Sequence, residues 1–221
     1  MKQHFHKELE QLKKSIALMG GRIEEAIKNA VTALRDRDVA LAAEVIAGDQ
    51  DIDRMEIRIE QRCLNLLALQ QPMAVDLRFI TAVLRINTDL ERMGDLATNI
   101  AREARRISKT DAGYIPLDLD EIIAEVRKMV RDSLEALLKH DTALARTICR
   151  EDDIVDSLDR EISERLIEMM KNEPDCVDAA TQMLLAVRHL ERIADLATNI
   201  AEEVVFMVEG RSIKHRAEDN E

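Results

Sequence analysis

The sequence predicts an all-α protein built from two tandem three-helix bundles, and three observations support this fold class. Aromatic residues make up only 2% of the 221 residues, whereas strands favour aromatic and β-branched side chains. Only six glycines and three prolines interrupt the chain, which indicates long helices joined by few turns. The segment "LERMGDLATNIA" at residues 90–101 returns as "LERIADLATNIA" at residues 190–201, with ten of twelve positions identical.

The repeat extends through both halves of the chain. A shift of 103 residues places Asp49 and Asp53 on Asp152 and Asp156, and after the corner at Pro72 the shift becomes 100. The second copy has therefore lost three residues at a corner, where a length change leaves helix packing intact. Helical-hairpin arrays repeat every ~34 residues. This much longer period favours two bundles over a solenoid.

Prolines mark the inner corners of the two copies. Pro72 and Pro174 each interrupt a long helical pattern, and Pro116 lies in "SKTDAGYIPLDLDE", which has the Gly, Pro and Asp content of a linker. Periodicity and these breaks predict helices over residues 8–36, 38–70, 73–107, 119–139, 141–171 and 176–209. The predicted domains are a first repeat at 1–107, a linker at 108–118, a second repeat at 119–209 and a polar C-terminal tail at 210–221.

Charge and hydropathy restrict the class of function. A net charge of -12 disfavours a nucleic-acid binder, whose affinity comes mostly from neutralising phosphates, and suits cationic or basic partners. The N-terminal "MKQHFHKELEQLKK" lacks the apolar core of a signal peptide, and no apolar run approaches the ~20 residues of a membrane-spanning helix. The three cysteines form no CxxC pair, and Cys63 and Cys149, which fall at apolar positions of helical patterns, are expected to be buried reduced thiols. We expect a cytoplasmic protein.

Acidic residues share one flank of the third predicted helix. At 100° per residue, Glu91, Asp95 and Asn99 lie at about 100°, 140° and 180° from Leu90, the centre of the apolar stripe. These side chains are therefore expected beside the core, on one side of it. Gly94 lies near the core side of the same helix, and we interpret it as a packing residue that permits close approach of a neighbouring helix.

The second predicted helix carries acids on the matching flank. Asp49 and Asp53 lie at about 60° and 100° from Ile52 in its apolar stripe. Two antiparallel helices that face each other bring equivalent flanks to the same side of the pair. The heights also agree, because Asp53 is 19 residues before Pro72 and Glu91 is 19 after it, while Asp49 and Asp95 are each 23 away. One acidic face is therefore predicted in the first copy.

The second copy repeats this arrangement. Asp156 and Asp152 lie 18 and 22 residues before Pro174, and Glu191 and Asp195 lie 17 and 21 residues after it. Asn199 follows Asp195 by one helical turn, as Asn99 follows Asp95. A second acidic face is therefore predicted from separate residues.

Four carboxylates at one level repel one another, and raised pKa values, arginine partners or a bound cation can relieve that repulsion. Oxygen-only sites suit hard ions such as Mg²⁺, Ca²⁺, Mn²⁺ or iron. Asn99 and Asn199 can add neutral oxygens. The alternative is a solvated acidic face without metal, in a chain that is 34% charged. Because matched acids occur twice, we predict metal binding.

Enzyme signatures are missing from the sequence. It contains no G-x-x-x-x-G-K-[ST], G-x-G-x-x-G or G-x-S-x-G motif, and no histidine follows a glutamate by three residues, as in di-iron bundles. We therefore predict a non-enzymatic protein with no catalytic residues and no organic cofactor. The alternative is a helical-bundle metalloenzyme, such as an oxidase or phosphohydrolase, or a metal-storage protein.

The segments "LALQQPMAVDLRFITAVLRINTDLERMGDLATNIA" and "RHLERIADLATNIAEEVVFMVEG" resemble the PhoU family of phosphate-transport accessory proteins, and the resemblance covers nearly the whole chain. It implies tandem three-helix bundles in a cytoplasmic, often dimeric negative regulator of the phosphate-starvation response. Its implied partners are the ATPase of a phosphate ABC transporter and a sensor histidine kinase, so it would be peripheral to membrane complexes.

The resemblance also implies a set of metal ligands. Some family members bind iron or other metals at paired E(D)-x-x-x-D motifs, so iron, manganese, magnesium and zinc are the candidate ions here. Those motifs correspond to two sets of residues in this sequence: Asp49, Asp53, Glu91 and Asp95, and Asp152, Asp156, Glu191 and Asp195.

Overall fold

The computed structural model describes residues 2–110 and 118–213, and every regular element in these ranges is helical. The elements are α1 (Lys2–Asp36), α2 (Val39–Gln70), α3 (Val75–Ile107), α4 (Asp120–Lys139), α5 (Thr142–Asn172), the short 3₁₀ helix η1 (Pro174–Cys176) and α6 (Val177–Glu209). The predicted all-α fold of two three-helix bundles is confirmed. In the described part of the chain, no helix is long and apolar enough to cross a membrane.

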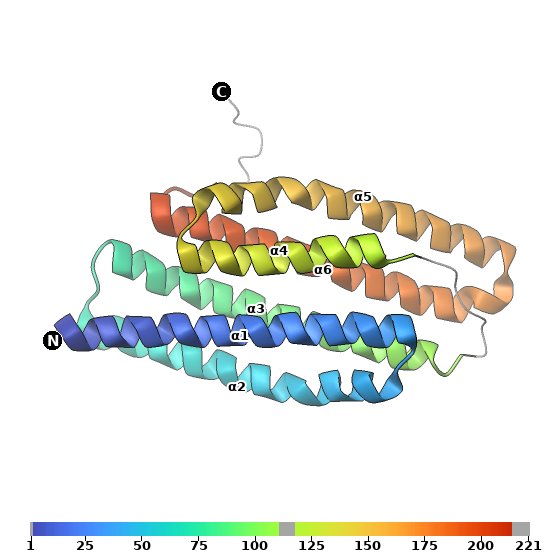
Figure 1. The fold of residues 1–221 in the computed structure, drawn as a ribbon, viewed down its shortest axis with the longest axis horizontal. Helices are drawn as coiled ribbons and strands as arrows, with labels where there is room; N and C mark the ends of the chain where they lie inside the picture. The colour runs from blue at the N-terminus through green and yellow to red at the C-terminus, as the bar shows by residue number, and fades with distance from the viewer. Residues whose placement is uncertain (1, 111–117, 214–221) are drawn as a thin grey trace, which may run out of the picture.

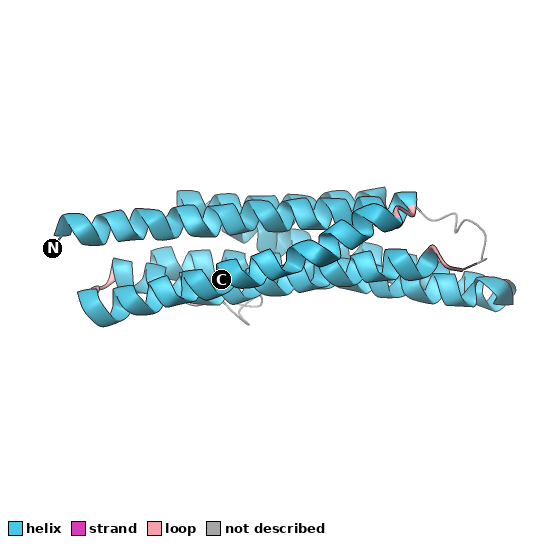
Figure 2. Ribbon diagram, turned by 90° about the horizontal axis from the view of Figure 1, so that it is seen from below, coloured by secondary structure: helices cyan, strands magenta, loops and turns pink. Residues whose placement is uncertain are grey.

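The two repeats pack side by side into an elongated molecule. Helices α1, α2 and α3 form one bundle, and α4, α5 and α6 form the other (Figure 1). The most extensive contact between the repeats runs along α3 and α6, and a smaller one joins α1 to α4. All the long helices run roughly along the long axis of the molecule (Figure 2). Buried apolar side chains from both repeats form one continuous core.

The repeat extends to the caps of the helices. Asp38 precedes α2 and Asp141 precedes α5, each in an extended backbone conformation. The Asp38 carboxylate accepts hydrogen bonds from the first free N–H groups of its helix at 2.9 and 3.0 Å, and Asp141 does the same at 3.0 and 2.9 Å. Such caps stabilise a helix by ~1 kcal/mol, which explains why both α2 and α5 begin at the same point of their copy.

The inner corners of the two repeats differ. Between α2 and α3 the chain turns through two non-glycine residues with positive φ, Gln71 (φ 45°) and Ala74 (φ 45°), and α3 begins at Val75 instead of residue 73. Between α5 and α6, η1 makes the turn instead. The three-residue difference between the copies therefore replaces a loop with a compact helical turn.

Other helix boundaries agree with the sequence expectation to within one residue, except that α1 begins at Lys2 instead of residue 8. The cysteines of the described residues are free thiols: Cys63 and Cys176 are buried and Cys149 is half-buried. Residues 111–117 of the predicted linker and 214–221 of the predicted tail lie outside the described residues.

Candidate metal centres

The acids predicted in the first repeat meet between α2 and α3. We call Asp49, Asp53, Glu91 and Asp95 the first acidic face. Burial, followed by the charges of neighbouring acids that include Asp95, Asp53 and Asp49, raises the pKa of Glu91 to about 6. Burial also raises the pKa of Asp49, and Asp95 and Asp53 add to that rise. Carboxylates on two different helices therefore interact. This agrees with their predicted directions around the helix axes and their predicted distances from the corner at Pro72.

The second repeat brings its four predicted acids together in the same way. We call Asp152, Asp156, Glu191 and Asp195 the second acidic face. Burial, followed by the charges of Asp195 and Asp156, raises the pKa of Asp152 to about 6. The pKa of Asp195 is raised by burial and then by Asp156 across the helix pair. The two copies thus present two separate carboxylate clusters.

Close packing of α2 and α3 holds the first acidic face together. A Cβ atom built on Gly94 would lie 3.1 Å from Cδ1 and 3.2 Å from Cγ2 of Ile52, which is 5% exposed. The missing side chain therefore lets the two helices approach beside the acids. This geometry supports the interpretation of Gly94 as a packing residue.

Sequence reasoning did not single out the threonines of the repeated segment. Thr98 is 2% exposed, and its hydroxyl forms a hydrogen bond with Asp49 that lowers the pKa of that carboxyl against the effect of burial. Thr198 is the equivalent residue beside Asp152, and it too lowers the pKa of its neighbour. The repeated "DLATN" segment could have identified Thr98, because the helix period places this residue at about 80° from Leu90, on the acidic flank.

Two further acids extend the clusters by one helical turn. Glu56 raises the pKa of Glu91, and its own pKa is raised by burial and then by Glu60, Asp53 and Asp95. Asp159 is its counterpart in the second repeat, where it raises the pKa of Glu191. Helix geometry places Glu56 at about 40° from Ile52, near the acidic flank, although the ligands predicted from the sequence were the E(D)-x-x-x-D residues and the two asparagines.

The two predicted asparagines are half-buried and lie at the far end of the faces. Asn99 Oδ1 accepts a hydrogen bond from Arg102 Nη1 at 2.7 Å. This amide oxygen would have to leave Arg102 before it could bind a cation.

The donor chemistry of both faces fits a hard cation, but the side chains are not gathered around one centre. Across residues 2–110 and 118–213, no group of three or more His, Cys, Asp or Glu side chains is arranged to hold a metal ion. Carboxylate and hydroxyl oxygens dominate each face, and such ligands suit Mg²⁺, Mn²⁺ or iron. Mutual repulsion separates uncompensated carboxylates, so an arriving ion would have to draw them inward by side-chain rotation.

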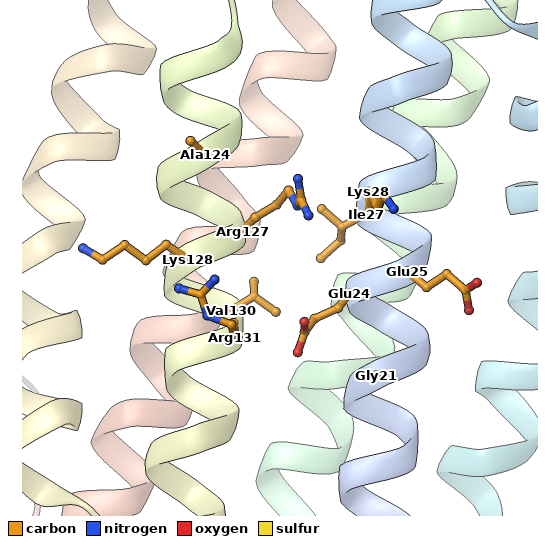
Figure 3. Close-up of a pocket in the computed structure, with 10 residues that line it drawn as sticks. All are labelled: Gly21, Glu24, Glu25, Ile27, Lys28, Ala124, Arg127, Lys128, Val130 and Arg131. Carbon is orange, nitrogen blue, oxygen red and sulfur yellow. The ribbon is translucent and has the colours of Figure 1, made fainter.

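An open groove lies elsewhere, between α1 and α4. It has a volume of about 470 Å³, and its charged lining includes Glu24 of α1 and Arg127 and Arg131 of α4. Glu24 points toward α4 and Arg127 toward α1 (Figure 3). The groove is open and mixed in charge, and none of the predicted site residues lines it.

The fold and the two faces define a class: an all-helical protein of two repeated three-helix units, each with a carboxylate cluster between its second and third helices. The PhoU domain model matches residues 16–104 and 119–204, and the chain belongs to the PhoU family.

Relatives of known name match nearly the whole chain. The phosphate-specific transport system accessory protein PhoU homolog of Pseudomonas putida is 37% identical over 216 residues, covering 96% of this chain and 84% of the relative. The crystal structure of PhoU from Pseudomonas aeruginosa superposes with a TM-score of 0.88 at 36% identity, covering 94% of this chain and 100% of the other. That of the phosphate transport system regulatory protein PhoU from Streptococcus pneumoniae also gives 0.88, at 31% identity and 94% and 98% coverage.

Proposed function

We propose that this protein is a non-enzymatic regulator of phosphate uptake, an adaptor whose two acidic faces bind metal ions and form part of its docking surface. Membership of a family of phosphate-transport accessory proteins supports the regulatory role. The observation that supports metal binding most strongly is the duplicated carboxylate cluster, in which burial and neighbouring acids raise the pKa of Glu91 and of Asp152 to about 6. Such crowding is relieved by a bound cation.

The acidic faces would have two electrostatic states. They are strongly negative without cations and partly neutral with them, and a partner protein can discriminate between such states only through different affinities for them. A difference of ~1.4 kcal/mol shifts the bound population tenfold. The proposed partners are the ATPase subunit of a phosphate ABC transporter and a phosphate-sensing histidine kinase. Our proposal places a homodimer in the cytoplasm, where it represses the phosphate-starvation response.

One observation favours a metalloenzyme as the second candidate. A carboxyl whose pKa is about 6, as at Glu91 and Asp152, is suited to general acid–base chemistry near neutral pH. An enzyme also requires a pocket that surrounds its substrate. Asp95 and Asp195 are exposed on the helix surfaces, which favours docking over catalysis. A turnover screen with phosphate esters and reductants beside the binding assays distinguishes the two candidates.

The experiment that tests the proposal is complementation of a gene deletion. Deletion should release phosphate-starvation genes in phosphate-replete cells. A variant with all eight carboxylates of the two faces changed to Asn or Gln should restore repression only partly at normal abundance. Full restoration would show that the faces are not needed for signalling, and failure of the deletion to derepress would refute the regulatory role.

Direct binding is measured with purified proteins. The metal-loaded chain should capture the transporter ATPase and the kinase, and the eight-carboxylate variant should capture them more weakly. Elemental analysis of protein purified without chelator then shows which ion the faces carry.

A further inference from the structure

The second acidic cluster contains a cation supplied by the chain itself. Arg188 of α6 donates a hydrogen bond from Nη1 to Asp159 Oδ2 of α5 at 2.7 Å. The Asp159 side chain is only 2% exposed, so its negative charge is held away from water. The charge of Arg188 also lowers the pKa of Glu191 against the effect of burial. The other oxygen, Asp159 Oδ1, is buried without a hydrogen-bond partner in the described chain. The guanidinium therefore neutralises the charge of this carboxyl through one of its two oxygens.

The first repeat has no such group at the equivalent place. The internal repeat aligns Asp159 with Glu56 and Arg188 with Thr88. Thr88 is neutral, and its hydroxyl donates to the backbone oxygen of Leu84 at 3.4 Å. Within the described residues, no ion pair holds Glu56. The same position is thus neutralised in one copy and uncompensated in the other.

The arginine nearest the first face does not take over this role. Arg102 lies at the opposite end of the face, where it binds the neutral amide oxygen of Asn99 at 2.7 Å. It lowers the pKa of Asp49, but no salt bridge joins it to a carboxylate of the described chain. The end of the first face that contains Glu56 and Glu91 therefore lacks a basic partner.

A tethered guanidinium competes with a free ion for the same carboxylate. The arginine is already fixed in place by the fold, so it loses little of the translational freedom that a free ion loses on binding. Its positive charge also repels an ion that approaches within a few ångströms. Both effects lower the affinity of the second face for an added cation at this level of the helix pair.

We infer that Arg188 is a built-in counter-ion that withholds Asp159 from an added cation, whereas the equivalent Glu56 is open to serve as an additional ligand in the first face. The inference rests on the proposed cation binding and goes beyond the E(D)-x-x-x-D residues. It makes the two faces unequal: the first depends on external cations for neutralisation, and the second is partly neutralised by its own sequence.

Single-face proteins allow the two positions to be compared. Asp152→Asn with Asp195→Asn leaves only the first face, and Asp49→Asn with Asp95→Asn leaves only the second. Binding of Mn²⁺ is measured by equilibrium dialysis and by the electron paramagnetic resonance signal of the free ion. Circular dichroism confirms that each variant is folded.

The matched substitutions at the two positions have different expected results. Glu56→Gln should weaken Mn²⁺ binding to the first face by about tenfold, since one carboxylate ligand is lost. Asp159→Asn combined with Arg188→Gln removes the ion pair without changing the net charge, so this pair of substitutions should change binding to the second face by less than about twofold.

The arginine itself can be exchanged between the copies. Thr88→Arg, at an exposed position of α3, should weaken Mn²⁺ binding to the first face by about tenfold. Arg188→Thr should strengthen binding to the second face, and it should lower the melting temperature of the metal-free protein in a way that added Mn²⁺ reverses. Thr88→Arg is informative even if Arg188→Thr does not fold.

Two results would overturn the inference, and they are distinguishable from each other. Equal weakening by Glu56→Gln and by the paired Asp159→Asn and Arg188→Gln substitutions, with no effect of Thr88→Arg, would leave metal binding intact and remove the role of Arg188. If the unchanged protein binds no Mn²⁺ at either face, the proposed metal binding fails together with this inference.

Discussion

Replacing Glu91 with glutamine should stabilise the metal-free protein at neutral pH. The ordinary pKa of 4.5 rises to about 6, and the cause is burial followed by the charges of Asp95, Glu56, Asp53 and Asp49. A shift of this size corresponds to ~2 kcal/mol, and solvent screening of a half-buried carboxyl reduces it to ~1 kcal/mol. Glutamine keeps the shape without the charge, so Glu91→Gln should raise the free energy of unfolding at pH 7 by about that amount.

The sign of the pH dependence follows from the direction of the shift. The folded-state pKa lies above the unfolded value, so protonation of Glu91 favours the folded state. This contribution is complete below pH 4.5 and is lost as the pH rises through about 6. The stabilising effect of Glu91→Gln should therefore be present at pH 7 and absent at pH 4. For a chain of this length, ~1 kcal/mol corresponds to a melting-temperature change of roughly 2–4 °C.

Chelator-treated protein is unfolded by heat and by urea at pH 7 and pH 4, and Glu191→Gln serves as the matched control. Arg188 lowers the pKa of Glu191, so this substitution should give a smaller gain at pH 7. A loss of stability with Glu91→Gln at pH 7, or a gain of equal size at pH 4, would refute the argument that charge crowding destabilises the first face.

Three further predictions follow from the packing, the caps and the separation of the faces. Gly21→Ala should stabilise α1 by ~1 kcal/mol because nothing lies within 4 Å of the added Cβ. Gly94→Ala should instead destabilise the protein, because the added Cβ would lie 3.1 and 3.2 Å from the two branches of the buried Ile52 side chain. Urea unfolding of both variants compares the two effects. Asp38→Ala and Asp141→Ala should each cost ~1 kcal/mol in the same assay, and no loss would mean that the caps are not stabilising. Asp53→Asn with Glu91→Gln should abolish metal binding by the first face and leave the second, as measured by elemental analysis; unchanged stoichiometry would refute the ligand assignment, and collapse of the metal-free fold would show a structural role.

The convergence of the acids could be predicted because it depends on local geometry. Helix period fixes the direction of Glu91 relative to Leu90, and a short corner fixes the height of Asp53 relative to Glu91. The partners of the long polar side chains could not be predicted in the same way. Arg102 reaches Asn99 at 2.7 Å and Arg188 reaches Asp159 at 2.7 Å through side-chain rotations that the helix period does not determine.

The packing of the repeats against each other adds a second reason for the repeated segment. Leu96 and Glu103 of α3 are 6% and 4% exposed, and they lie at about 240° and 220° from Leu90, away from the acidic flank. Along the same direction, Arg85 of α3 binds Glu203 of α6 at 3.1 Å, so this side of α3 faces α6.

Helix α3 is therefore constrained on three sides: by the core of its own bundle, by α6, and by the acids that meet those of α2. A helix that contacts a single core can vary the residues on its other faces, whereas α3 and α6 leave few positions free. Close identity over twelve residues follows when most positions of a helix are fixed by packing and the remaining ones by charge. The two acidic faces thus explain why the acidic residues of the segment are repeated. The contact between the repeats explains why Leu96 is repeated as Leu196.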